Sequence, residues 1–114
     1  MSEAELTELE DVASPGAGAC GGQFTANTMA CAFEALGISP GGSAMVPAED
    51  DEKNTVSEKI GELVMRVLAD DLRPSKVITR ESLENAIACV AVSGGSTNAV
   101  LHLLAVANLS LIHI

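Results

Sequence analysis

Residues 15–36 read Pro-Gly-Ala-Gly-Ala-Cys-Gly-Gly-Gln-Phe-Thr-Ala-Asn-Thr-Met-Ala-Cys-Ala-Phe-Glu-Ala-Leu. Four of the first eight residues are glycine, which lets the backbone take positive φ angles and approach other groups closely. From Thr25 onward the apolar residues have helical spacing. Thr25 is a suitable N-cap, and Gly37 is typical of the residue that ends a helix. The stretch predicts a glycine loop that carries Cys20 directly into a helix.

Cys20 is the candidate metal ligand or nucleophile of this loop. A thiol just ahead of a helix N-terminus lies at the positive end of the helix dipole, which favours the thiolate, the form that binds metals or attacks carbon. A cysteine in a glycine loop is also compatible with an incidental small residue. The chain has three cysteines and no Cys-x-x-Cys pair, so its own thiols cannot complete a structural site of four ligands.

Two blocks of sequence resemble one enzyme family in the same order. Residues 15–30, continuing to Glu-Ala-Leu-Gly at 34–37, are similar to the third cluster-cysteine motif of the dihydroxy-acid dehydratase family, which also contains phosphogluconate and aldonate dehydratases. The second block comprises Arg-Pro-Ser at 73–75, Thr-Arg-Glu-Ser-Leu-Glu-Asn-Ala-Ile at 79–87 and Gly-Gly-Ser-Thr-Asn-Ala-Val-Leu-His-Leu-Leu-Ala at 94–105. The likeness covers about residues 3 to 107.

The resemblance implies an iron–sulfur, magnesium-dependent hydro-lyase that converts a 2,3-dihydroxy acid into a 2-keto acid and water, in the biosynthesis of isoleucine and valine. It implies that Cys20 is the one cluster ligand that this chain supplies, and therefore its cofactor-binding and metal-binding residue. It assigns no catalytic residue within the chain. The cluster is either a [2Fe–2S] or a [4Fe–4S] form, and the complete enzyme, which also binds Mg²⁺, is expected to be a homodimer acting on a small-molecule dihydroxy acid.

The expected fold is mostly α in this segment, as part of the N-terminal domain of a larger α/β dehydratase subunit. Residues 1–108 are the expected partial N-terminal domain, and residues 109–114, Leu-Ser-Leu-Ile-His-Ile, depart from the family pattern. His113 is therefore not expected to be a site residue. Because the resemblance places the remaining cluster and magnesium ligands outside this segment, the isolated chain is expected to be inactive.

Two other functions stay open at this point. The sequence Cys-Gly-Gly-Gln-Phe-Thr-Ala-Asn-Thr-Met at 20–29 is more similar to the dihydroxy-acid enzyme than to the phosphogluconate enzyme, whereas an aldonate dehydratase is harder to exclude. The alternative from a different class is a non-catalytic helical interaction module. That alternative predicts that replacing Cys20 with alanine changes no activity of the complete protein.

Charge and composition exclude several kinds of partner. Six basic and sixteen acidic residues give a net charge of -10, which argues against binding to nucleic acid or an anionic membrane. The chain has no apolar run of the roughly 18 residues that a membrane span requires, and its acidic N-terminus is unlike a signal peptide. We expect a cytoplasmic protein, because three cysteines without a pairing pattern suit a reducing compartment.

The remaining helices are predicted from capping signals and apolar spacing. They are expected at about 2–13, with Ser2 and Glu5 as a capping box; at 55–69, with Thr55 and Glu58 as a capping box; at 79–92, capped by Thr79; and at 97–108. The Pro- and Gly-rich stretch at 38–49 is predicted to be a linker. Pro74 is expected to enforce a break between two helices.

Several further residues have a structural and a functional interpretation. The acidic run Glu49-Asp50-Asp51-Glu52 suits magnesium, but acids ahead of a helix more often stabilise its N-terminus. The Gly94-Gly95-Ser96-Thr97-Asn98 turn is compatible with an anion site or with close packing. Thr25, Asn27 and residues 96–98 are suggested to shape the site. His102 is expected to be a core histidine rather than a base, and Cys31 and Cys89 to be packing residues.

Overall fold

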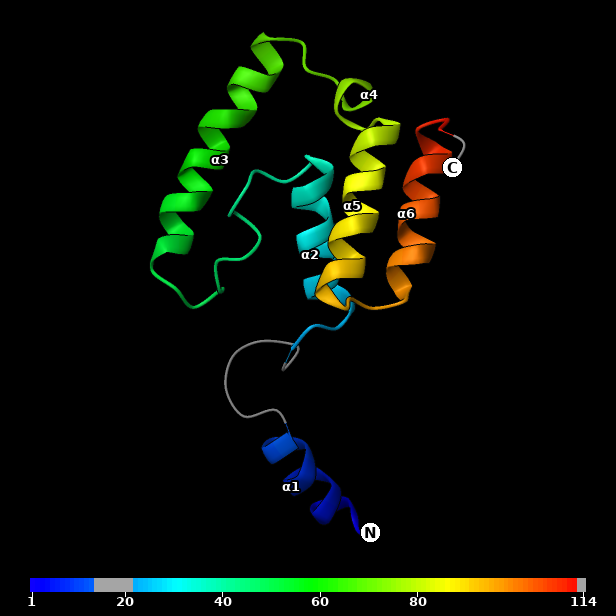
Figure 1. The fold of residues 1–114 in the computed structure, drawn as a ribbon. Helices are drawn as coiled ribbons and strands as arrows, with labels where there is room; N and C mark the ends of the chain where they lie inside the picture. Colours follow the sequence, from blue (N-terminus) through cyan, green and yellow to red (C-terminus); the bar gives the residue numbers. More distant parts are fainter. Residues whose placement is uncertain (14–21, 113–114) are drawn as a thin grey trace.

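The computed structural model describes residues 1–13 and 22–112 of the chain (Figure 1). Cys20 and His113 lie outside these ranges. The described residues form six helices and no strand: α1 (Glu3–Ala13), α2 (Thr25–Leu36), α3 (Glu52–Ala69), α4 (Pro74–Val77), α5 (Arg80–Ser93) and α6 (Asn98–Leu109). The prediction that this segment is mostly α is confirmed. None of these helices is both long enough and apolar enough to cross a membrane.

The core lies where α2, α5 and α6 pack side by side (Figure 1). Its buried apolar residues are Met29, Ala32 and Leu36 of α2, Leu83 and Ala86 of α5, and Ala99, Leu103 and Ala107 of α6. Half of these residues are alanine, so the helix backbones approach closely and the leucines fill the space between them. The apolar spacing of α2 and α5 therefore places Met29, Ala32, Leu36, Leu83 and Ala86 against α6 in the core.

Helices α1, α3 and α4 contribute no residue to this core. Neither α1 nor α3 contains a buried residue, and Val64 and Leu68 on the apolar stripe of α3 are largely exposed. The radius of gyration is 17.7 Å, against about 13 Å for a compact domain of this length. The helix predicted over 55–69 is present, and its apolar stripe is only partly covered, since Leu63 and Val67 are half-buried.

The caps predicted from the sequence are present at three helix ends: the starts of α1 and α5 and the end of α2. The Glu5 carboxylate accepts hydrogen bonds from both the backbone N–H and the hydroxyl of Ser2 at the start of α1. At the start of α5, the Thr79 hydroxyl accepts the N–H of Ser82, and the Ser82 hydroxyl accepts the N–H of Thr79. Gly37 ends α2 with a φ of 89°, a left-handed conformation that favours glycine.

Two predicted N-caps were wrong. Thr25 is the first residue of α2 and Phe24 is the N-cap, because the Thr25 hydroxyl is engaged with Ser96 and Asn98 instead of with its own helix. The helix predicted to start at Thr55 begins three residues earlier, at Glu52. There the Asp50 carboxylate accepts the N–H of Glu52 at 2.9 Å, which agrees with the helix-stabilising interpretation of the acidic run.

The stretch over 38–49 contains no helix, as predicted, but side chains from both flanking helices hold it in place. The Glu34 carboxylate on α2 accepts the N–H groups of Gly42 and Ala44, both at 2.8 Å. The Lys53 ammonium on α3 donates to the carbonyls of Ser43 at 3.3 Å and Val46 at 3.1 Å. Four backbone groups of this segment are therefore satisfied by two charged side chains.

The turn between α5 and α6 packs tightly on α2. Thr28 is 1% exposed, and its hydroxyl accepts the N–H of Ser96 at 2.9 Å. A Cβ atom built on Gly95 would lie 2.7 Å from the Thr28 methyl group and 3.2 Å from a methyl group of Val90. The close-packing interpretation of this glycine turn is therefore the one found in the structure. Only glycine fits at position 95 without displacing a neighbour.

Replacing Gly95 with alanine is expected to lower the free energy of unfolding by about 1–3 kcal/mol, because the added methyl group overpacks the contact with Thr28. Gly61 provides a matched control, since no atom lies within 4 Å of a Cβ built there. Gly61→Ala is expected to raise stability by about 0.5–1 kcal/mol through the helix propensity of α3. Denaturant unfolding measures both changes, and equal effects of the two substitutions would contradict the tight packing at Gly95.

The start of α5 is expected to weaken in acid. Hydrogen bonding to its own backbone N–H and to the Thr79 hydroxyl lowers the pKa of the Glu81 carboxyl below its usual 4.5. A carboxyl with a lowered pKa stabilises the fold at higher pH, and this contribution is lost as the pH falls through the folded-state value. In an NMR titration, Thr79→Ala is expected to raise the pKa of Glu81, whereas Thr55→Ala within α3 leaves it unchanged. A Glu81 pKa that is unaffected by Thr79→Ala would show that this cap does not act on the carboxyl.

Candidate functional site

Polar side chains gather at the start of α2, five residues after Cys20. The Thr25 hydroxyl accepts a hydrogen bond from the Asn98 side-chain amide at 2.8 Å and lies 3.2 Å from the Ser96 hydroxyl. The Ser96 hydroxyl accepts the backbone N–H of Asn98 at 3.2 Å. We call Thr25, Ser96 and Asn98 the Thr25 cluster. The structure therefore brings Thr25 together with two residues of the 96–98 turn, as the sequence suggested, although they are more than 70 positions apart.

A second set of polar contacts ties α2 to the end of α5. The Asn27 amide donates to the side-chain oxygen of Gln23, and the Gln23 amide donates to the Ser93 hydroxyl at 3.3 Å. Asn27 thus bonds to Gln23 rather than to the 96–98 turn with which the sequence analysis grouped it. Thr97 is exposed at the N-cap position of α6 and makes no side-chain capping bond.

An open cavity of about 700 Å³ lies between the start of α2 and the stretch that precedes α3. We call it the α2 cavity. The residues lining it are Gly22, Gln23, Ala26, Asn27 and Ala30 on the side of α2, Ala44, Met45, Val46, Pro47 and Ala48 on the opposite side, and Lys53. One wall is therefore apolar, and the other carries two amides. None of the described residues that line it is acidic.

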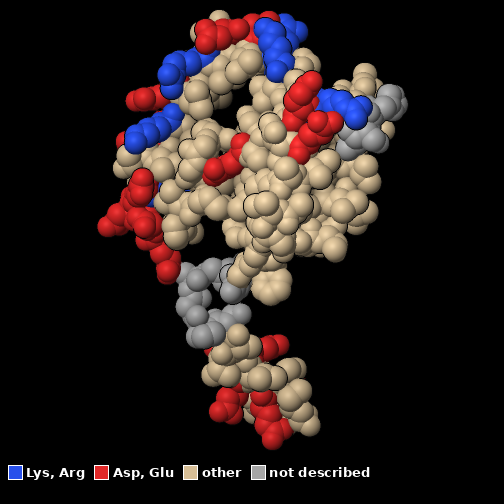
Figure 2. All heavy atoms as spheres, viewed as in Figure 1, with Lys and Arg blue, Asp and Glu red and all other residues tan. Residues whose placement is uncertain are grey.

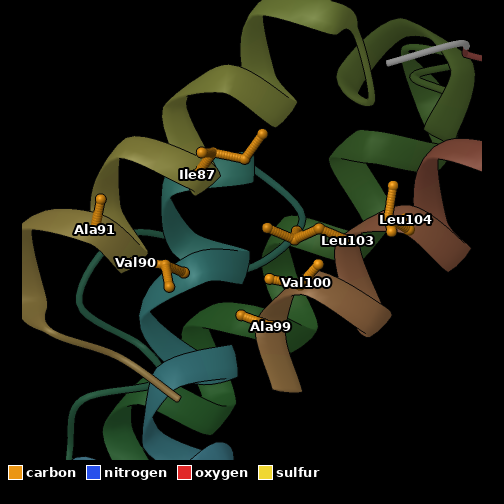
Figure 3. Close-up of a pocket in the computed structure, with 7 residues that line it drawn as sticks. All are labelled: Ile87, Val90, Ala91, Ala99, Val100, Leu103 and Leu104. Carbon is orange, nitrogen blue, oxygen red and sulfur yellow. The ribbon is translucent and has the colours of Figure 1, made fainter. Parts of the chain in front are cut away.

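A smaller hollow of about 400 Å³ lies between α5 and α6 (Figure 3). Its lining is entirely apolar: Ile87, Val90, Ala91, Ala99, Val100, Leu103 and Leu104. Figure 2 shows acidic side chains on α1 and near the start of α3, whereas the surface formed by α6 is uncharged. Without a polar or charged group, this hollow is able to pack against apolar surface but not to orient a reactive molecule.

Metal-binding residues do not converge in the described part of the chain. Across residues 1–13 and 22–112, no group of three His, Cys, Asp or Glu side chains is placed to hold a metal ion. Cys31 is half-buried, with its sulfur 3.6 Å from that of Met45, and Cys89 is half-buried on α5. Cys20, the predicted cluster ligand, lies outside the described residues. A cysteine thiol is chemically suited to ligating an iron–sulfur cluster.

The core position predicted for His102 was wrong. His102 is exposed on α6, because the core contacts of this helix are made by Ala99, Leu103 and Ala107 on a different face. No described residue packs over the side that carries the histidine.

Two residues that organise the site were missed by the sequence analysis. Thr28 shares its helical spacing with Ala32 and Leu36, and all three are buried. A buried hydroxyl requires a hydrogen-bond partner. A threonine at an apolar position of the helix therefore indicated a contact of the kind that Thr28 makes with Ser96. Lys53 had no comparable signal, because its partners are backbone carbonyls of an irregular segment.

Comparison with known proteins places the chain in a family. Residues 1–114 match the family model described as dihydroxy-acid/6-phosphogluconate dehydratase N-terminal. A dihydroxy-acid dehydratase from Koribacter versatilis is 63% identical over 108 residues, covering 95% of this chain and 19% of the relative. Dihydroxy-acid dehydratases from a Roseiflexus species and from Thermus thermophilus are 59% and 55% identical over 107 residues, with 94% of this chain and 19% of each relative covered.

The chain spans about a fifth of the length of these curated relatives. Both blocks of residues that carried the resemblance, around Cys20 and over 73–105, lie within the match to the family model. The chain belongs to the dihydroxy-acid/6-phosphogluconate dehydratase family, in the region of its N-terminal domain.

Proposed function

We propose that this chain is part of a dihydroxy-acid dehydratase, which removes water from a 2,3-dihydroxy acid to give a 2-keto acid on the route to branched-chain amino acids. The observation that supports this function is the identity of 55–63% with relatives named dihydroxy-acid dehydratase over nearly the whole chain. An identity at this level over a continuous segment favours the same chemistry in the protein to which the segment belongs. The helical module without catalysis has no comparable support.

In this proposal Cys20 contributes one thiolate ligand to an iron–sulfur cluster, of either the [2Fe–2S] or the [4Fe–4S] form. A bound cluster of this kind supplies a Lewis-acidic iron for the departing 3-hydroxyl, and Mg²⁺ supplies a second positive charge for the substrate carboxylate and 2-hydroxyl. The described residues contain no complete metal site. The remaining ligands are therefore assigned to the rest of the subunit, which we propose to be a homodimer in a reducing cytoplasm.

The role proposed for the described residues is to hold the surroundings of Cys20 in place. Two sets of hydrogen bonds join the start of α2 to the turn before α6. One set lies within the Thr25 cluster, and the other is the bond from the Ser96 N–H to the hydroxyl of the buried Thr28. Thr25 and Ser96 present hydroxyls and Asn98 presents an amide at the start of α2, which follows Cys20 by five positions in the sequence. Such groups are suited to positioning a hydroxylated acid by hydrogen bonds.

A segment exchange tests this function. The 108-residue matching region of the Koribacter versatilis relative would be replaced by its counterpart from this chain, and dehydration of 2,3-dihydroxyisovalerate would be measured with the purified chimera. We expect the chimera to be active and to show the visible absorption of an iron–sulfur cluster. Cys20→Ser in the chimera is expected to abolish activity and reduce the cluster absorption, because a cluster ligand is lost. The isolated chain is expected to be inactive.

Cys89→Ser provides the matched control, since Cys89 lies half-buried on α5 and has no proposed role in the site. This variant is expected to keep both the activity and the cluster absorption. A folded chimera that retains full activity after Cys20→Ser would contradict the proposed role of Cys20. A folded chimera with no activity on any dihydroxy acid would contradict the proposed function of this chain.

A further inference from the structure

We infer that the α2 cavity is a substrate-specificity site whose wall at Met45 and Val46 accepts the apolar branch of a dihydroxy acid and disfavours sugar acids that carry hydroxyls in the same place. This inference rests on the proposed dehydratase function, and it names the residues that determine substrate specificity. The cavity begins at Gly22, two positions after Cys20, and runs along the first turns of α2. It is thus next in sequence to the proposed cluster ligand.

The wall opposite α2 offers only apolar side chains. It consists of residues 44–48, Ala-Met-Val-Pro-Ala, in which Met45 is 44% exposed. Removing an aliphatic branch from water and placing it against this wall is favourable, because apolar surface is buried. A sugar acid would place hydroxyl groups against the same surface, where no side chain of residues 44–48 offers a hydrogen bond. Leaving a hydroxyl unsatisfied costs free energy, so the wall discriminates between the two substrates.

The same cavity carries groups that recognise an acid. Lys53 contributes a positive charge to the lining, in which no other described residue is charged. The Lys53 ammonium has three N–H donors, of which two are directed at the carbonyls of Ser43 and Val46. The remaining donor and its charge favour an anionic ligand over a neutral one in the cavity. The Gln23 and Asn27 amides add polar groups to the α2 side of the lining.

The apolar wall is held in a defined position before any ligand arrives. Glu34 fixes the backbone N–H of Ala44, and Lys53 fixes the carbonyl of Val46, so hydrogen bonds from two helices flank Met45. A preformed wall does not have to be ordered on binding, which lowers the entropic cost of binding a small ligand. The hollow between α5 and α6 lacks these features, because all of its lining residues are apolar (Figure 3).

The test uses the segment-exchange chimera described above and two polar substitutions of similar size, Met45→Gln and Val46→Thr, made together. The specificity is the ratio of kcat/KM for 2,3-dihydroxyisovalerate to kcat/KM for gluconate. We expect the double substitution to lower this ratio at least tenfold, since changes of one small group in an apolar pocket alter discrimination by about 10–200-fold. Met65→Gln on α3, an exposed methionine outside the cavity, is the matched control and is expected to leave the ratio unchanged.

A second variant separates recognition of the acid from selection by the wall. Lys53→Gln removes the positive charge but keeps side-chain donors for the two carbonyls, and it is expected to raise KM about tenfold for both acids with little change in their ratio. If the double variant does not fold, Val46→Thr alone is measured against the same control. A ratio unchanged by the polar wall, in a chimera that remains active, would overturn the specificity site and leave the proposed function standing. An unmodified chimera inactive on both acids would instead overturn the proposed function.

Discussion

The architecture around the candidate site depends on one close contact, in which the buried Thr28 hydroxyl accepts the N–H of Ser96. Gly95 makes this contact possible, because a side chain at that position would collide with Thr28. The contact brings the first turn of α2 against the turn that leads into α6, so Thr25 meets Ser96 and Asn98. One hydrogen bond and one missing Cβ atom thereby join two blocks of sequence that are far apart in the chain.

A second constraint organises the other side of α2. Glu34 and Lys53 satisfy backbone groups of a segment without regular structure, and an unpaired buried backbone group would be costly. The segment is therefore held beside the first turns of α2 and leaves the α2 cavity between them. The helical core supports both constraints, because α2 contributes Thr28 to the first and Glu34 to the second.

The positions of α1, α2, α3, α5 and α6 and the cap at Thr79 could be predicted, because they depend on neighbouring residues in the chain. The short helix α4, which begins at Pro74, was not predicted. The predictions of N-caps at Thr25 and Thr55 failed, since tertiary contacts to Ser96 and Asn98 take the first hydroxyl, and Asp50 already stabilises an earlier start for α3. The grouping of Thr25 with Ser96 and Asn98 was predicted. The apolar spacing of Thr28 indicated that its hydroxyl needs a partner but not that the partner is Ser96, and nothing in the sequence indicated the contacts of Lys53. The role of Cys20 remains a prediction, since it lies outside the described residues.

Amide hydrogen exchange at Ser96, compared between Thr28→Val and Thr28→Ser, tests the central contact most directly. Valine keeps the shape of the side chain but removes the acceptor, whereas serine keeps the hydroxyl. Because a lost hydrogen bond to a buried group costs about 1–3 kcal/mol, we expect Ser96 to exchange about tenfold faster or more in Thr28→Val, and close to the unmodified rate in Thr28→Ser. Equal exchange of the Ser96 amide in both variants would show that Thr28 does not hold the turn on α2.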